Sequence, residues 1–289
     1  MQKIVQRRKF FLSRMLCNVA PRFWMELRYF QIFKKRFHRK SPQTYAERLI
    51  TAMQSSEYEK LTPYADKWKV REYVTEVVGE QYLPPLLAVY AAPEEIVYDQ
   101  IPEGAFIKLN HGSGFNIPYH RHQLGEIQKQ VKDWFYEDFT KAYQEAQYRN
   151  IEKKILVEEN ILSQGETLWE YSFFVFRGRV EFVQIYNNQK QRFEVGRDYE
   201  TLPFRLYSTV TEIQPKSVWF ETMRTMAEQL AAIFTFVRVD FMLAGDKIYF
   251  SELTFSPGAG LRRFYPEEYN YIFGKKLTFD IHGVIHESV

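Results

Sequence analysis

Two predicted β-hairpins in the second half of the chain constrain its fold more than any other feature. Apolar segments at residues 172–176 and 180–185 flank the turn Arg177-Gly178-Arg179, and residues 236–243 and 247–255 repeat this arrangement around a second glycine-containing turn. Segments rich in Val, Ile, Phe and Tyr on either side of such a turn are typical of antiparallel strands. The chain therefore has to build a sheet from hairpins, with helices packed against it.

The first half of the chain has mainly helical spacing. Residues 41–44 read Ser-Pro-Gln-Thr and precede Glu47, which is a helix-start signal. Helical patterns are predicted at residues 64–79, 122–148 and 217–233, and further strands at residues 86–90, 106–110 and 155–161. Because helices concentrate in the first half and hairpins in the second, the sequence predicts an α+β fold with two lobes.

The amino-acid composition predicts a folded protein without a disulfide framework or a membrane-spanning helix. At 289 residues, with 45% hydrophobic and 17% aromatic content, the chain can bury a core and is not expected to be disordered. Cys17 is the only cysteine, which excludes a disulfide framework and a cysteine-based zinc site within one chain and fits a reducing compartment. No apolar run approaches the length of about 20 residues that a membrane-spanning helix requires.

Residues 1–40 form a basic segment that differs from the rest of the chain. They contain twelve Lys or Arg residues and one acidic residue, Glu26, for a net charge of +11, whereas residues 41–289 carry 27 Lys or Arg and 35 Asp or Glu, a net charge of −8. Large apolar residues are interleaved with the basic ones, so we predict a helical arm that lies on an anionic membrane surface. The alternative is an ordinary packing helix with a solvated basic face. Nucleic acid is not predicted as a partner, because the body is acidic and has no recognised binding motif.

Two carboxylates and an arginine are expected on one face of the second hairpin. Arg238 and Asp240 alternate with apolar residues and therefore share the polar face of their strand. If the turn comprises residues 244–246, Arg238 lies opposite Glu252 and Asp240 lies diagonal to it, about 7–8 Å apart at Cα. A divalent cation can bind such a pair of acids, with the arginine beside it for an anion. The alternative is a structural Arg–Glu pair with a solvated aspartate, and a register shift of one residue would move Glu252 to the other face.

Two glycine-containing loops accompany this hairpin. The first follows a predicted strand in FIKLNHGSGFNI, residues 106–117, and the second follows Glu252 in TFSPGAG, residues 254–260. Backbone N–H groups in such loops can bind an anion, although most short glycine pairs are ordinary turns. A lysine with a glycine loop, a pair of acids and a second glycine loop together predict a magnesium–nucleotide site. The sequence has no Gly-x-Gly-x-x-Gly or Walker A pattern, which disfavours Rossmann and P-loop folds.

Five segments together resemble the TupA-like branch of the ATP-grasp superfamily. They read ADKWKVREYV, FIKLNHGSGFNI, ILVEENI, FVRVDF and FSELTFSPGAG, occur in the order of that family, and extend the resemblance over residues 41–277. The resemblance implies a two-lobed fold that binds ATP between its lobes. Residues 41–160 would form the helical part and the central lobe, and residues 161–289 the C-terminal lobe, with residues 1–40 outside the family pattern.

The resemblance also implies roles for individual residues. The positions that bind nucleotide in the family correspond to Lys67, Lys108, Gly112, Ser113, Gly114, Asn116, Glu158, Glu159, Ile161 and Glu170. The two lysines would contact the phosphates beneath the glycine loop. Residues Glu158 to Ile161 would contact the adenine, and Glu170 would contact the ribose. Asp240 and Glu252 correspond to the magnesium ligands, and Arg238 and Lys108 to the catalytic residues.

Two positions depart from the pattern of the TupA-like branch, and a third departs from other ATP-grasp ligases. Thr254 is usual in the branch but stands where many ATP-grasp ligases have asparagine, so the sequence leaves open whether one or two ions bind. Phe115 replaces a usual glycine and Ser172 a usual lysine, which bears on loop closure and on the acceptor pocket. The expected contacts with an anionic acceptor are the residues next to the two loops, His111, Arg262 and Arg263.

The family chemistry implies an ATP- and Mg²⁺-dependent carboxylate–amine ligase that forms an amide through an acyl phosphate. We predict that it joins an amino acid to a uronic acid or a similar carboxylate in capsule or surface-polysaccharide biosynthesis, in the cytoplasm at the inner face of the membrane. Two alternatives remain. One is a sugar kinase on the same fold, and the other is a catalytically silent nucleotide-binding subunit of a glycan-assembly complex.

Overall fold

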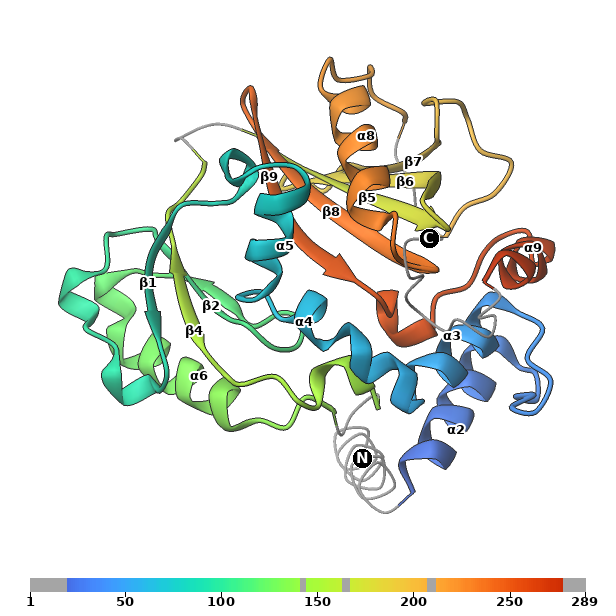
Figure 1. The fold of residues 1–289 in the computed structure, drawn as a ribbon, viewed down its shortest axis with the longest axis horizontal. Helices are drawn as coiled ribbons and strands as arrows, with labels where there is room; N and C mark the ends of the chain where they lie inside the picture. Colours follow the sequence, from blue (N-terminus) through green and yellow to red (C-terminus); the bar gives the residue numbers. More distant parts are fainter. Residues whose placement is uncertain (1–19, 141–143, 163–166, 207–211, 278–289) are drawn as a thin grey trace, which may run out of the picture.

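The computed structural model describes residues 20–140, 144–162, 167–206 and 212–277, which form two antiparallel sheets and the helices that pack on them (Figure 1). The strands are β1 (Leu86–Tyr90), β2 (Phe106–Leu109), β3 (Asn116–Pro118), β4 (Ile155–Glu158), β5 (Leu168–Phe176), β6 (Arg179–Asn187), β7 (Arg192–Gly196), β8 (Phe236–Ala244) and β9 (Lys247–Thr254). The α-helices are α2 (Pro21–Phe33), α3 (Tyr45–Met53), α4 (Thr62–Ala65), α5 (Val70–Val77), α6 (Leu124–Tyr136), α8 (Phe220–Ala231) and α9 (Glu268–Lys276).

The two sheets differ in size and come from different halves of the chain. The small sheet has the strand order β1-β4-β2-β3, and the large sheet has the order β7-β6-β5-β8-β9. Figure 1 shows the small sheet in green on the left and the large sheet in yellow and orange beside it. The predicted α+β class and both predicted hairpins, β5–β6 and β8–β9, are confirmed, whereas β3 and β7 are strands that the sequence analysis missed.

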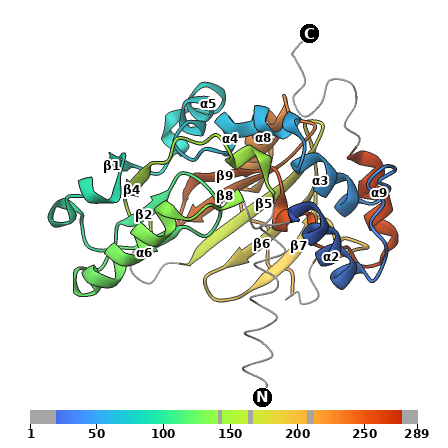
Figure 2. The same ribbon diagram turned by 90° about the horizontal axis from the view of Figure 1, so that it is seen from below.

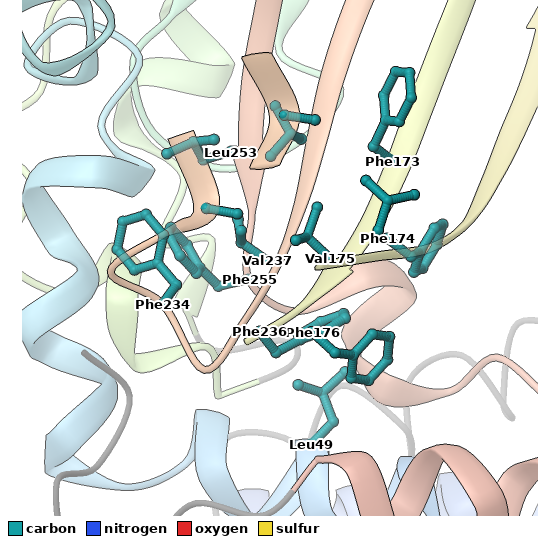
Figure 3. Close-up of a cluster of buried hydrophobic side chains, with 14 of the residues drawn as sticks. Leu49, Phe173, Phe174, Val175, Phe176, Phe234, Phe236, Val237, Leu253 and Phe255 are labelled. Atoms are coloured by element: carbon teal, nitrogen blue, oxygen red, sulfur yellow. The ribbon is translucent and has the colours of Figure 1, made fainter. Parts of the chain in front are cut away.

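The large sheet carries most of the core and is covered on both faces. On one face Phe173 packs on Phe220 of α8, with ring centroids 5.7 Å apart. On the other face Phe176 packs on Phe236 at 4.8 Å, and Tyr45 of α3 meets Phe236 edge-on at 5.8 Å. Figure 3 shows side chains of this core at the end of the sheet nearest α3. Coverage on both faces explains why β5 and β8 have long buried stretches rather than a simple in–out alternation.

The small sheet has a core of its own. Ile127 and Val131 of α6 are buried in one cluster with Ile107 and Leu109 of β2. These helix positions are four residues apart and so lie on the same face. The helix predicted across residues 122–148 is thus present but shorter, because α6 ends at Tyr136.

Residues 64–79 do not form the single helix that the sequence analysis predicted. The chain leaves α4 at Asp66, whose carboxylate accepts hydrogen bonds from the backbone N–H of Trp68 at 2.8 Å and Lys69 at 3.3 Å. Helix α5 begins only at Val70. An aspartate that bonds backbone donors two and three residues ahead favours a turn over a continuing helix. The break leaves Lys67 between two helices. In contrast, the predicted capping box of Thr44 and Glu47 is confirmed at the start of α3.

The basic N-terminal segment contributes a packed helix. Met25, Tyr29 and Phe33 on α2 are buried in the main core cluster, which agrees with the packing alternative for this face of the helix. Figures 1 and 2 both show α2, α3 and α9 at the same end of the molecule. Residues 1–19 of the predicted arm lie outside the described residues. In the described part of the chain, no helix is both long and apolar enough to cross a membrane.

Candidate functional site

The register of the hairpin β8–β9 differs from the predicted one at two places, and together the two differences leave Asp240 and Glu252 on the same face. The turn has two residues rather than three, because Ala244 pairs with Lys247, and a bulge at Ser251 then shifts the pairing by one residue. Asp240 consequently lies directly opposite Glu252, and Arg238 lies opposite Thr254. The predicted pairs Arg238–Glu252 and Asp240–Phe250 are therefore wrong, but the bulge returns Glu252 to the face of Asp240. Sequence spacing alone does not reveal a bulge, which adds an unpaired residue to one strand.

Arg238, Asp240, Glu252 and Thr254 form a connected polar cluster on this face. The guanidinium of Arg238 donates to both carboxylate oxygens of Asp240, with Nε–Oδ1 at 2.8 Å and Nη2–Oδ2 at 2.5 Å. The same Nη2 donates to Oγ1 of Thr254 at 3.0 Å, and this hydroxyl donates to Oε1 of Glu252 at 2.9 Å. Charge-assisted, two-point contacts of this kind fix the orientation of both partners.

Burial and charge act in opposite directions on the two acids. Burial raises the pKa of Asp240 to about 6 although Arg238 opposes the shift, and the charge of Glu252 adds to it. Burial would also raise the pKa of Glu252, but Lys67 and Arg238 outweigh it and hold that pKa below its usual value. Both carboxylates are therefore mainly ionised near pH 7, and Asp240 is the one of the two whose charge is lost first as the pH falls.

Lys67 connects three parts of the site. Its Nζ donates to the backbone oxygen of Gly112 at 2.7 Å and lies 3.4 Å from Oε2 of Glu252. Its backbone N–H donates to the oxygen of Asn110 at 3.0 Å, which holds the segment between α4 and α5 against the strand that precedes the glycine loop. One side chain thus joins that loop to the acid on the large sheet.

A second charged cluster lies on the small sheet. Lys108 of β2 and Glu158 of β4 form an ion pair with Nζ–Oε2 at 2.5 Å, and Arg71 of α5 approaches the other oxygen of Glu158 at 3.3 Å. Arg71 also donates to the backbone oxygen of Pro84 at 2.9 Å. Burial lowers the pKa of Arg71, while the charge of Glu158 opposes that shift. The sequence analysis missed Arg71, and the only available signal was its place four residues after Lys67 in the same motif.

Glu252 of the first cluster and all three residues of the second line one cavity of about 170 Å³ between the sheets, whereas Arg238 and Asp240 do not line it. Of the residues singled out from the sequence, those that line it are Lys67, Lys108, Ser113, Gly114, Phe115, Asn116, Glu158, Glu170 and Glu252. Arg71, Leu83 and Phe250 complete the apolar and basic walls. The volume of this cavity is below the range of about 300–1,000 Å³ usual for a ligand pocket, and a second hollow of about 1390 Å³ adjoins the cavity at Arg71, Leu83 and Pro84.

Other predicted site residues lie away from this cavity. Glu159 and Ile161 follow β4 and do not line it, and the N–H of Glu159 donates to the oxygen of Pro85 at 2.9 Å. Arg263 is 3.5 Å from Glu267 and stacks over Tyr265, and neither it nor Arg262 lines the cavity.

His111 is buried beside the first loop, where its ring meets Phe115 edge-on at 5.6 Å. Burial is the main cause that lowers the pKa of His111 to about 4, with the charges of Lys153 and Lys67 adding to it. The ring is therefore neutral near pH 7. It does not border the cavity, and its predicted contact with substrate stays a prediction.

The two glycine loops have different surroundings. Gly112 and Gly114 both have positive φ, and the second of them faces open space next to the cavity. In the second loop, by contrast, Pro257, Ala259 and Gly260 are buried, and a Cβ at Gly260 would lie 2.8 Å from Cγ1 of Ile50 on α3. Gly258, between Pro257 and Ala259, is exposed, and the anion-binding role predicted for residues 254–260 stays a prediction.

Glu145 is a buried acid that the sequence analysis missed. Its Oε1 accepts a hydrogen bond from the hydroxyl of Ser256 at 2.5 Å, and Gln147 donates to the same hydroxyl at 2.6 Å. Burial raises the pKa of Glu145 to about 7, against the hydrogen bond from Ser256 and together with the charge of Glu252. No local signal marks this residue, because its partner is 111 positions away in the chain.

Asp240 and Glu252 are the residues that fit a divalent cation. They are direct cross-strand partners and offer four carboxylate oxygens. Mg²⁺ typically binds to one or two carboxylates and takes its other ligands from substrate phosphates and water. Among the described residues, no cluster of three or more His, Cys, Asp or Glu side chains could hold a metal by itself. The donor set therefore suits Mg²⁺ that arrives with a nucleotide.

Comparisons with known proteins give a family match and several similar solved structures. A family model described as TupA-like ATPgrasp matches residues 47–278. One similar solved structure is a D-alanine–D-alanine ligase from Helicobacter pylori, with a TM-score of 0.47 and 13% identity over 74% of this chain and 60% of that chain. Another is a D-alanine–D-alanine ligase from Bacillus anthracis complexed with ATP, with a TM-score of 0.41 and 13% identity over 66% of this chain and 53% of that chain. The ATP-grasp ligase PsnB complexed with minimal precursor, Mg and ADP is also similar, with a TM-score of 0.39 and 11% identity over 71% of this chain and 53% of that chain.

These structures limit what can be transferred to this chain. The chain spans only 53–60% of the length of these three solved proteins, and its identity to them is at most 13%. None of the curated proteins compared with the chain matches it significantly. The family match, in contrast, extends over most of the sequence and includes both charged clusters of the site. The chain belongs to the TupA-like ATP-grasp family.

Proposed function

We propose that the protein is an ATP-dependent carboxylate–amine ligase that forms an amide through an acyl phosphate. The observation that carries this proposal is the meeting of Lys67, Lys108, Glu158 and Glu252 around one cavity between the two sheets. Two lysines suit the phosphates of a nucleotide, and an ionised glutamate suits the amino group of adenine. Family membership supports the nucleotide, and the acids on β8 and β9 support phosphoryl transfer.

ATP would lie with its adenine at the small sheet and its phosphates at the large sheet. Glu158 and the backbone of residues 159–161 would meet the adenine, and Glu170 the ribose. Residues 112–116 would fold over the phosphates, which Lys67 and Lys108 neutralise. For this, Lys67 has to exchange Glu252, and Lys108 has to exchange Glu158, for phosphate oxygens, since both lysines are paired in the structure.

In the first step, a carboxylate oxygen of the acceptor attacks the γ-phosphorus and the bond to ADP breaks. Mg²⁺ held by Asp240 and Glu252 would supply charge compensation for the phosphates. Arg238 is oriented by Asp240 and Thr254 and would meet the transferring group. In the second step, an amine attacks the acyl carbon, loses a proton and expels phosphate. Free carboxylate is a poor electrophile, so the phosphate provides the leaving group.

We infer that the acceptor is a uronic acid or a similar carboxylate of a capsule or surface polysaccharide and that the amine is an amino acid. His111, Arg262 and Arg263 remain the predicted acceptor contacts. The protein would act in the cytoplasm at the inner face of the membrane, because residues 1–40 concentrate a charge of +11 while the body is acidic.

Mass spectrometry of reactions with ATP, Mg²⁺, uronic acids and a mixture of amino acids tests the proposal. We expect ADP, phosphate and an amide, and a hydroxamate when hydroxylamine replaces the amino acid, because hydroxylamine traps acyl phosphates. A phosphorylated sugar without hydroxamate would instead identify a kinase. Nucleotide binding without turnover, over a broad panel of acceptors, would identify a silent subunit. Either of these results would overturn the ligase assignment.

A further inference from the structure

Helix α2 exposes apolar side chains on the face opposite its packed one. Phe23 is 56% exposed and Phe30 53% exposed, and Leu27 lies between them with partial exposure. Positions four and seven residues apart share one side of a helix. Large aromatic side chains that lie together on a surface indicate a contact site more often than isolated ones do.

These side chains line a hollow of about 640 Å³ beside the segment that follows the helix. Phe37 extends the apolar floor, and basic residues from that segment form the rim. Arg39 donates to Glu26 at 3.1 Å, so the only acidic residue among the first forty is already paired. Within the described residues, Arg36 and Lys40 are exposed and form no ion pair. The hollow therefore combines apolar side chains with uncompensated positive charge.

The position of the hollow in the molecule adds a second argument. It lies at the end where α2, α3 and α9 meet (Figure 2), while the body beyond residue 40 has a net charge of −8. Lys35 forms an ion pair with Glu267 and lies 5.7 Å from the ring centroid of Tyr271, which ties the segment after α2 to α9. An acidic body with one basic, apolar end has a preferred orientation at a negatively charged surface.

We propose that this end of the protein docks on an anionic lipid bilayer through the α2 hollow. Phe23 and Phe30 enter the boundary between headgroups and acyl chains, and Arg36 and Lys40 contact lipid phosphates. Aromatic side chains prefer this depth, and basic residues near an anionic leaflet add an attraction that salt screens. Binding of lipid at this surface does not depend on which reaction the protein catalyses, so the proposal stands independently of the ligase activity.

Co-sedimentation of the full-length protein with vesicles tests the proposal. The vesicles contain either phosphatidylglycerol with phosphatidylcholine or phosphatidylcholine alone. We expect binding to the anionic vesicles only, and a drop of about tenfold or more for Phe23→Ser/Phe30→Ser at all salt concentrations. The matched control is Tyr136→Ser/Val218→Ser, which removes two exposed apolar side chains elsewhere and leaves binding unchanged.

A second pair of variants isolates the charge. Arg36→Gln/Lys40→Gln lowers binding by about fivefold per charge at low salt, and the difference shrinks as salt rises. Lys129→Gln/Lys132→Gln on α6 is the control and has no effect. Unchanged binding in the phenylalanine variant, or equal binding to neutral vesicles, overturns the proposal. So does a shift from dimer to monomer in the phenylalanine variant without any loss of vesicle binding, since the hollow would then be covered by a second copy.

Discussion

The two glycine-containing loops resemble each other in sequence and differ in what surrounds them. Gly114 has a φ of +78° and no heavy atom within 4 Å of its Cβ position, beside the cavity. Gly260 has a similar φ of +71°, but a Cβ there would meet Cγ1 of Ile50 at 2.8 Å. At Gly114 the first loop thus uses glycine only for its backbone conformation, whereas at Gly112 of the same loop a Cβ would lie 2.8 Å from the ring of Phe139. The second uses it for conformation and for close contact with a helix.

This difference shows what a glycine pattern can and cannot indicate. Positive φ favours glycine whatever lies next to the loop, so the pattern reports a backbone requirement. Whether the bare backbone faces a ligand or a neighbouring helix depends on distant parts of the chain. For the second loop the neighbour is α3, which lies about two hundred residues earlier in the sequence.

The largest expected effect is on turnover, and it comes from variants of β8 and β9, the hairpin that leads into the second loop. If the chemistry of this half resides on β8 and β9, Asp240→Asn and Glu252→Gln each lower turnover by at least about 10²–10³-fold, because an electrostatic contact with the reacting phosphates is lost. Asp246→Asn in the exposed turn of the same hairpin is the control. Steady-state ADP release checks the rates, and circular dichroism checks the fold. Normal Mg²⁺-dependent turnover in a folded variant would contradict the assignment.

The second largest expected effect is a loss of stability when the packing of the second loop is disturbed. Gly260→Ala is expected to lower the free energy of unfolding by about 2–4 kcal/mol, since a left-handed alanine costs about 1–2 kcal/mol and overpacking against Ile50 adds to it. Urea denaturation measures the change. Gly125→Ala on α6 is the control, because that glycine is helical and has no neighbour within 4 Å, and it should be neutral or slightly stabilising. A loss below about 1 kcal/mol would mean that the loop does not hold its contact with α3.

Much of the fold followed from local patterns, whereas the contacts of the site did not. Apolar segments on either side of a turn predicted β5, β6, β8 and β9, and the capping residues predicted the start of α3. The bulge at Ser251 was missed because the spacing of apolar residues does not reveal an unpaired residue. The break at Asp66 was missed although its signal is local, since the helical spacing of the apolar residues outweighed the turn preference of the aspartate. Arg71 and Glu145 were missed for a different reason. Their partners, Glu158 and Ser256, are 87 and 111 positions away.

The second loop also buries Glu145, which predicts a pH dependence of stability. Its pKa is raised from 4.5 to about 7. Between these values the folded protein keeps a proton that the unfolded chain releases, so the stability present below pH 4.5 is lost as the pH rises toward 7. We expect Glu145→Gln to remove about 3 kcal/mol of this decline between pH 4.5 and 7.5. Unfolding curves of both proteins across that range check it, and parallel pH profiles would show that Glu145 is not buried as described.

Beside the first loop, Lys108→Ala is expected to weaken ATP binding by about 1.5–3 kcal/mol, because a phosphate loses a charge-assisted partner. Part of this loss is offset, since the wild-type lysine must first leave Glu158. Calorimetric titration with ATP and Mg²⁺ measures the difference, with Lys132→Ala on α6 as the control. An unchanged dissociation constant would place the phosphates elsewhere.

The smallest expected effect concerns Gly114 and bears most directly on the comparison of the two loops. Gly114→Ala should lower the free energy of unfolding by about 1 kcal/mol, because its only cost is the left-handed backbone at a φ of +78°, with open space around the new Cβ. Urea denaturation beside Gly260→Ala therefore gives two substitutions with similar backbone strain and different packing. The excess loss at Gly260 measures the contact with Ile50. If the two variants lose equal stability, Gly114 is packed as closely as Gly260 in solution, and the first loop is not the open one.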